Sequence, residues 1–301
     1  MSTPGLIALA ISLLVSAGQS ALRPDRSIKC SSCDEWNVSI EGFKVFGNTY
    51  YVGTAGLSAL LITSDQGHIL LDGGLTQSAP LVAANIVKLG FKVEDIKLIL
   101  NSHAHYDHAA GIAALQRASG ATVVSSASGA EGFALGNAVP DDPQAGFGKA
   151  ANAFPAVKNV RVVKDREMVT VGPLAVQMHN TAGHTPGSTT WTWQSCVDGK
   201  CLNLVYADSI SAIAAPGFRF TGDAKTPSRV EQFRNSIATV GELPCDIMIT
   251  THPMATDLAG KLKKRAAKPA ADPFIDPQAC RVLAANAMKA LDARVAEESK
   301  K

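Results

Sequence analysis

Three of the seven histidines in this 301-residue chain lie within one short segment, His103-Ala104-His105-Tyr106-Asp107-His108. The segment directly follows residues 96–100, an apolar run that predicts a buried strand. Side chains two residues apart in an extended chain share a face, so His103 and His105 can bind one metal ion together. Asp107 and His108 lie on the turn that follows, where they can reach a second ion.

Two more histidines lie where a predicted strand becomes a loop. His184 belongs to a Gly- and Pro-containing string at 183–188, and His252 follows the strand predicted at 247–249. Three imidazoles leave a fourth tetrahedral position for water, which is typical of a catalytic zinc. We therefore expect two Zn²⁺ per chain, about 3.5–4 Å apart and sharing a hydroxide. The predicted ligands are His103, His105 and His184 for the first ion, and Asp107, His108 and His252 for the second.

Strand patterns and helix patterns interleave in two successive halves of the chain. The first half has predicted strands at 49–52, 58–63, 68–72, 96–100 and 122–125, with helices at 79–89 and 111–118. The second has predicted strands at 161–163, 168–171, 174–179, 189–194, 202–206 and 247–249, with helices at 227–240 and near the C-terminus. A long loop at 136–159 separates the halves. This order predicts an α/β fold with two packed sheets and helices outside them.

Composition limits the partners of the chain. Hydrophobic residues make up 46% of it, enough for a sizeable core, and we expect a single domain over residues 22–301. The net charge of +2 and the charged fraction of 18% do not favour a nucleic acid or an acidic membrane as partner. We expect a monomer that acts on a small molecule. The basic run Lys261 to Arg265 is interpreted as a solvent-facing side of a helix.

The first 21 residues resemble a signal peptide. An apolar run at 6–15 precedes small residues at 16–21, although no Lys or Arg stands before the run. A run of about ten residues is too short to span a bilayer. We therefore expect cleavage between about 17 and 21, a periplasmic or secreted location, and no membrane attachment after removal of the leader.

Six cysteines, an even number, suit an oxidising compartment. Cys196 and Cys201 bracket an Asp-Gly turn signal, which makes a short bridge across a hairpin end plausible. If Cys30 and Cys33 close their own small loop, Cys245 and Cys280 remain as a pair. Six cysteines allow 15 connectivities, and a CxxC pair can instead be a redox or zinc motif.

The histidine segment 103–108 resembles the HxHxDH signature of the metallo-β-lactamase superfamily. The resemblance implies an αββα sandwich of two mixed β-sheets with helices on the outer faces and metals at the edge between the sheets. Leu71-Asp72-Gly73-Gly74 resembles the preceding motif of that superfamily, in which the Asp supports the metal loop. Both motifs are shared by many activities, so they indicate a fold rather than a substrate.

Narrower strings are similar to β-lactamases of subclass B3, over about residues 36–281. They are residues 183–188, Trp191-Thr192-Trp193, and Tyr206-Ala207-Asp208-Ser209. Ser209 stands where related enzymes place a metal-binding Cys, and the resemblance implies that Ser209 and Ser211 contact the substrate carboxylate. Phe218 departs from relatives that carry a Tyr at this position. Phenylalanine cannot donate a hydrogen bond to a substrate carbonyl, so the metal alone would polarise it.

The resemblance implies hydrolysis of the β-lactam amide bond by a metal-bound hydroxide, which would confer antibiotic resistance. Asp107 would orient the hydroxide, and the chain contains no SxxK and no GxSxG motif for serine chemistry. The principal alternative is a related hydrolase acting on a lactone or a thioester. A single-iron oxidoreductase and a zinc-binding protein without turnover are two others.

Overall fold

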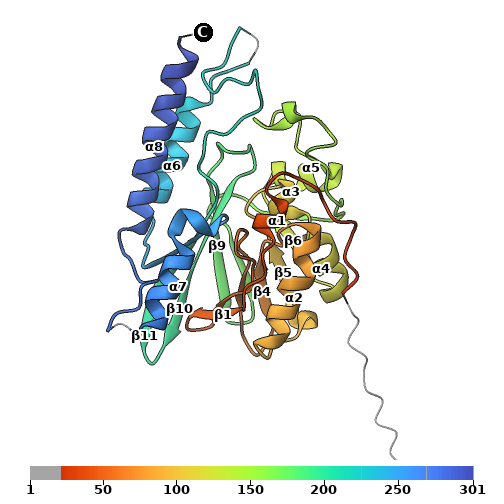
Figure 1. The fold of residues 1–301 in the computed structure, drawn as a ribbon, viewed down its shortest axis with the longest axis vertical. Coiled ribbons are helices and arrows are strands. Elements are labelled where there is room, and N and C mark those ends of the chain that lie inside the picture. Colours follow the sequence, from red (N-terminus) through yellow and green to blue (C-terminus); the bar gives the residue numbers. More distant parts are fainter. Residues whose placement is uncertain (1–21, 225, 269, 301) are drawn as a thin grey trace, which may run out of the picture.

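Two β-sheets lie face to face, and helices cover both outer faces (Figure 1). The computed structural model describes residues 22–224, 226–268 and 270–300, so the signal peptide predicted for residues 1–21 lies outside the described residues. In Figure 1, α6 and α8 lie on one side of the strands, and α2 and α4 lie on the other. The predicted αββα architecture is therefore confirmed.

The first sheet has seven strands in chain order, β1 to β7. The strands β1 to β4 pair antiparallel, whereas β4 to β7 are parallel. Parallel strands need crossover connections, and α2 and α4 supply two of them. The strand bounds are β1 Phe43–Phe46, β2 Thr49–Tyr51, β3 Leu60–Ile62, β4 His68–Leu71, β5 Ile96–Leu100, β6 Thr122–Ser125 and β7 Arg161–Val162.

The second sheet has five strands in the order β12-β11-β10-β9-β8. Its first four strands along the chain form an antiparallel meander, and β12 adds parallel to β11. That parallel pairing brings the C-terminal ends of β11 and β12 to the same edge. The strand bounds are β8 Met168–Val171, β9 Leu174–Asn180, β10 Thr189–Val197, β11 Lys200–Ala207 and β12 Ile247–Thr250.

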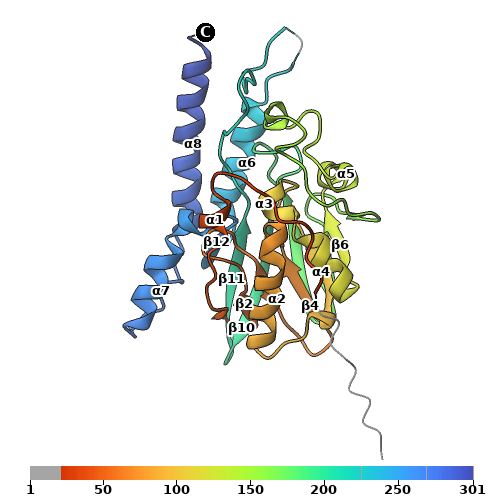
Figure 2. The same ribbon diagram turned by 45° about the vertical axis from the view of Figure 1, so that its right-hand side comes forward.

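Helices lie on both sides of the sandwich, as the turned view in Figure 2 shows. The first half contributes α1 Cys33–Trp36, α2 Ala79–Lys88, α3 Tyr106–Ala109, α4 Ile112–Ser119 and α5 Ala127–Leu135. The second half contributes α6 Val230–Glu242, α7 Leu258–Ala266 and α8 Ala279–Glu298. Short 3₁₀ helices occur at Thr76–Ser78, Val93–Asp95, Ala145–Phe147 and Pro253–Thr256. No helix in the described ranges is both long and apolar enough to cross a membrane.

Three apolar layers hold the sandwich together. The central layer lies between the sheets and includes the fully buried Trp191 and Tyr206 of the second sheet, packed with Leu71 and Leu100 of the first. A second layer lies between the first sheet and α2 and α4, and a third lies between the second sheet and α6 and α8. Burial of apolar surface contributes about 25 cal/mol per Å², so these layers are the main stabilising term.

Several elements were not predicted from the sequence. They are the strand β1 and the helices α1, α3 and α5. In α5 the helix contains Gly129 and Gly132, which lower helix propensity, but Ser126 caps its N-terminus by accepting a hydrogen bond from the backbone N–H of Gly129 at 3.2 Å. Local capping and tertiary packing therefore outweigh the weak pattern.

The six cysteines form three disulfides. The pairs are Cys30–Cys33, Cys196–Cys201 and Cys245–Cys280. The second joins the ends of the β10–β11 hairpin around the Asp198-Gly199 turn, and the third ties the start of α8 to the segment before β12. Each follows the pairing that the sequence made plausible.

Candidate metal centre

The predicted metal-binding residues meet at one edge of the sandwich, where the C-terminal ends of β4, β5, β11 and β12 come together. His103, His105, Asp107 and His108 follow β5, and His252 follows β12. The loop between β9 and β10 adds His184. Backbone hydrogen bonds join the two sheets here, from Thr189 N to Ser102 O at 2.8 Å and from Ser58 N to Thr251 O at 2.9 Å.

Asp72, at the end of β4, holds the turn that carries the histidines. One oxygen of its fully buried carboxylate accepts from Ser102 N at 2.8 Å and from Asn101 Nδ2 at 3.0 Å. The other accepts from Ser102 Oγ at 2.6 Å and from the Tyr206 hydroxyl at 2.8 Å. Burial raises the pKa of Asp72 to about 6, an effect that His108 and these hydrogen bonds oppose. The sequence predicted this supporting role for Asp72 but not for its three partners.

Two overlapping groups of side chains present candidate ligand atoms close to one another. Atoms of His103, His105 and His184 lie within 4.8 Å of one another, and so do atoms of His103, Asp107 and His108. His252 completes the second group, because its Nε2 lies 3.2 Å from Asp107 Oδ2 and 3.3 Å from His108 Nε2. The structure therefore brings together all six side chains that the sequence predicts as ligands.

The hydrogen bonds of two histidines show which ring nitrogen faces the centre. His103 Nδ1 lies 2.6 Å from Asp208 Oδ1, and a carboxylate can only accept, so Nδ1 carries the proton. The Nε2 of His103 is buried without a hydrogen-bond partner among the described residues. In His105 the assignment is reversed, because its Nε2 lies 3.1 and 3.2 Å from the Asp142 oxygens. The unprotonated nitrogen of each ring is thus free to bind a metal.

His184 and His252 follow the same arrangement with backbone carbonyls as acceptors. His184 Nδ1 donates to Ser211 O at 3.0 Å, and His252 Nδ1 donates to Gly56 O at 3.3 Å. Each Nε2 then carries a lone pair. A metal-binding imidazole usually donates its other N–H to a carboxylate or carbonyl, which fixes the ring and its tautomer. These four rings therefore fit a zinc site, since zinc takes neutral imidazole nitrogens.

The charges of the centre also favour a cation. Burial and the neighbouring His103 and His105 lower the pKa of His184 to about 3, which keeps that ring neutral. Burial opposes ionisation of Asp107, yet His108 and His252 hold the pKa of its carboxyl well below the usual range. Burial would lower the pKa of His108, but the carboxylates, Asp107 foremost, raise it to about 9. Positive charge is therefore stabilised beside Asp107.

Two residues of the long loop at 136–159 reach the centre and were not predicted from the sequence. One is Asp142, which contacts His105. The other is Gln144, whose side-chain Nε2 lies 3.4 Å from His184 Nε2. Apart from the length of the loop, which favours a functional role, the sequence gives no signal that singles them out.

The serines predicted to bind substrate lie beside the centre. Ser211 contacts His184 through its carbonyl and through its hydroxyl, which lies 3.2 Å from His184 Nδ1. The Ser209 hydroxyl lies 2.9 Å from Thr251 Oγ1, next to His252. Their contact with a substrate carboxylate stays a prediction.

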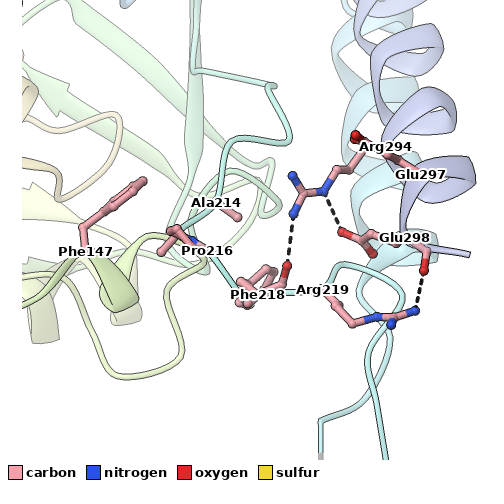
Figure 3. Close-up of a pocket in the computed structure, with 10 residues that line it drawn as sticks. Phe147, Ala214, Pro216, Phe218, Arg219, Arg294, Glu297 and Glu298 are labelled. Carbon is pink, nitrogen blue, oxygen red and sulfur yellow. Dashed lines mark hydrogen bonds and ion pairs between the residues drawn. The ribbon is translucent and has the colours of Figure 1, made fainter. Parts of the chain in front are cut away.

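A cavity of about 500 Å³ lies between the 214–219 segment and the end of α8 (Figure 3). Phe147 forms one wall, and the ring of Phe218 packs edge-on against Phe220 with ring centroids 5.1 Å apart. Arg294 donates to the Phe218 carbonyl at 3.0 Å and to Glu298 at 2.7 Å. The end of α8 therefore holds the segment that carries Phe218.

The fold and the metal centre together define a class of αββα metalloproteins, and comparisons with known proteins agree with that class. The family model of the metallo-beta-lactamase superfamily matches residues 53–197. The Rm3 metallo-beta-lactamase is 48% identical, with 90% of this chain and 100% of that chain covered and a TM-score of 0.85. MEM-A1, a subclass B3 metallo-beta-lactamase from a soil metagenome library, is 48% identical, with 88% and 99% covered and a TM-score of 0.83.

MIM-1 from Novosphingobium pentaromativorans is 40% identical, with 88% of this chain and 93% of that chain covered and a TM-score of 0.81. The chain belongs to the metallo-β-lactamase superfamily, and within it to subclass B3. A hydroxyacylglutathione hydrolase from Anaeromyxobacter dehalogenans (strain 2CP-C) is 32% identical over 141 residues. That alignment covers 46% of this chain and 42% of the hydrolase, so the chain spans less than half of that relative's length.

Proposed function

We propose that this protein hydrolyses the amide bond of β-lactams at a centre of two zinc ions. The observation that carries the proposal is the convergence of five imidazoles and Asp107, with four of the rings fixed by an acceptor on the side away from the centre. The relatives that the chain matches over nearly its full length bear the name metallo-beta-lactamase. We assign one ion to His103, His105 and His184, and the other to Asp107, His108 and His252.

Bound zinc supplies a water of lowered pKa as nucleophile and a Lewis acid for the carbonyl oxygen. The role of the protein is to hold these groups in place. Asp107 presents an ionised carboxylate between His108 and His252, where it can orient the attacking water. Ser209 and Ser211 flank the centre, and we assign them to the carboxylate of the substrate. Phe218 donates no hydrogen bond, so it has no part in polarising the carbonyl.

We further propose that the protein is exported, acts in the periplasm or outside the cell, and confers resistance to β-lactams. Three disulfides support the location, because such bonds persist in oxidising compartments. Fractionation of cells that express the full chain, with immunodetection of each fraction, tests the location. Protein confined to the cytoplasm would contradict it.

Hydrolysis of a thioester is the second candidate, and the partial similarity to a hydroxyacylglutathione hydrolase favours it. Zinc-loaded protein should be offered a chromogenic cephalosporin, a lactone and a glutathione thioester in parallel. We expect turnover of the cephalosporin alone, with a kcat about 10²-fold lower for Asp107→Asn, since that change removes a ligand charge and weakens the group that orients the water. Turnover of only the thioester or the lactone would replace the proposal by the alternative.

A further inference from the structure

The turn at residues 141–144 attaches the loop at 136–159 to His105 and to two other segments of the chain. Successive residues of this turn contact different elements. Asp141 accepts a hydrogen bond from Arg229 Nη2 at 3.2 Å, and the Pro143 carbonyl accepts from Ala215 N at 2.9 Å. Gln144 N donates to Asp142 Oδ1 at 2.7 Å, which closes the turn. The turn therefore joins the loop to the start of α6 and to the segment that contains Ala215.

Asp142 is the residue of this turn that reaches a candidate ligand. Both of its carboxylate oxygens lie within hydrogen-bond distance of His105 Nε2, at 3.1 and 3.2 Å, and its side chain is only 3% exposed. A carboxylate accepts and cannot donate, so it fixes the proton on Nε2 and directs Nδ1 to the metal. The same carboxylate fixes the turn through Gln144 N. One side chain thus holds both a metal ligand and the loop.

We propose that Asp142 is a positioning residue that couples zinc binding at His105 to the position of the 136–159 loop. Zinc favours one tautomer and one ring position of His105, and that state gives Asp142 its best hydrogen bond. Coupling between two sites is reciprocal, so a loop held in place also strengthens zinc binding. The proposal rests on the zinc centre of the proposed function, and it is independent of which bond the enzyme hydrolyses.

Asp141 provides a matched control for Asp142. It is the preceding residue, has the same side chain and belongs to the same loop, but its side chain is 61% exposed and its partner is Arg229. Asp142→Asn and Asp141→Asn remove the same charge by an isosteric change. Only the first removes the charged acceptor of His105, so differences between the two variants report that contact.

The first measurement is zinc affinity, obtained by competition with a chromophoric chelator. Loss of a carboxylate that supports a metal-binding histidine weakens metal binding by about 10–100-fold, which is the result expected for Asp142→Asn. Asp141→Asn should bind zinc like the wild type, because an ion pair with a carboxylate this exposed contributes little to holding the loop. Thermal melting of the metal-free variants verifies that both are folded. Wild-type zinc affinity in folded Asp142→Asn protein would overturn the proposal.

The second measurement is hydrogen exchange at the backbone amides of Gln144 and Ala145, with zinc and with chelator. Zinc should slow exchange in the wild type and in Asp141→Asn but not in Asp142→Asn. Equal slowing in all three proteins would overturn the coupling.

A third measurement needs no substitution. In ¹⁵N NMR spectra of the zinc-loaded wild type, His105 should carry its proton on Nε2, and a proton on Nδ1 would also overturn the proposal. If Asp142→Asn weakens zinc binding and abolishes the zinc-dependent slowing of exchange while the wild type leaves β-lactams intact, the proposed function fails and the coupling stands.

Discussion

Asp72→Ala should destabilise the protein strongly, because this carboxylate accepts four hydrogen bonds in a site without solvent access. Two of the four donors keep another partner. Asn101 Nδ2 also donates to His103 O at 2.9 Å, and the Tyr206 hydroxyl lies 3.1 Å from Ser58 O, to which it can donate once Asp72 is absent. The N–H and the hydroxyl of Ser102 lose their main acceptor.

An unsatisfied buried donor costs about 1–3 kcal/mol, so the two Ser102 donors together predict a loss of about 2–6 kcal/mol in the free energy of unfolding. Tyr206→Phe removes one donor and leaves Asp72 with three, so it should cost about 1.5–3 kcal/mol, the usual range for a hydrogen bond to a charged group. In the double variant the Tyr206 substitution should add little, because its partner is already absent.

The assay is equilibrium urea unfolding of metal-free protein at pH 8, with the disulfides intact. Removing the metal with chelator separates fold stability from zinc binding. The reasoning is refuted if Asp72→Ala costs under about 1 kcal/mol, less than a single unsatisfied donor. It is also refuted if the two single effects add fully in the double variant.

Three further predictions concern the metal, the carboxylate that we propose to be catalytic, and the end of α8. Excess chelator should abolish activity and lower the melting temperature, and added zinc should restore both, because zinc binds the folded state; full activity in chelator would contradict this. Asp107→Ala should lower kcat far more than His68→Ala, because His68 begins β4, at the end of the strand opposite to Asp72 and the centre; equal losses in steady-state assays would remove the basis for the assignment. Burial raises the pKa of Glu298, but hydrogen bonds from Thr221 N and Arg294 outweigh burial and lower it overall. The ionised form is therefore stabilised above the unfolded pKa of about 4.3, and the stabilisation is lost as pH falls through the folded pKa. Glu298→Gln should thus lower the melting temperature at pH 7, with a difference from wild type that shrinks below about pH 4; a constant difference would argue against it.

Much of the fold follows from local patterns in the chain. The strands β4, β5 and β6 were predicted because short β-branched and apolar runs are bounded by turn residues, and α2 because its apolar spacing ends at Gly90. The helix α5 was missed because its two glycines obscure the helical pattern of apolar residues. The strand β1 was missed because it is too short to show a clear alternation of apolar and polar residues. The basic run on α7 was interpreted as solvent-facing, but Arg265 donates to the backbone carbonyls of Lys44 and Val45 and pairs with Asp272.

The sequence by itself predicted the residues of the candidate metal centre, because His103 and His105 share a face of the extended chain and Asp107 and His108 follow on the next turn. Only the tertiary structure decided how the centre is supported. The contacts of Asp142 with His105 and of Tyr206 with Asp72 join segments far apart in the chain. Periodicity reports which face of an element is buried, but a hydrogen bond depends on the distance between two atoms. That distance is set only when the sheets and loops have packed.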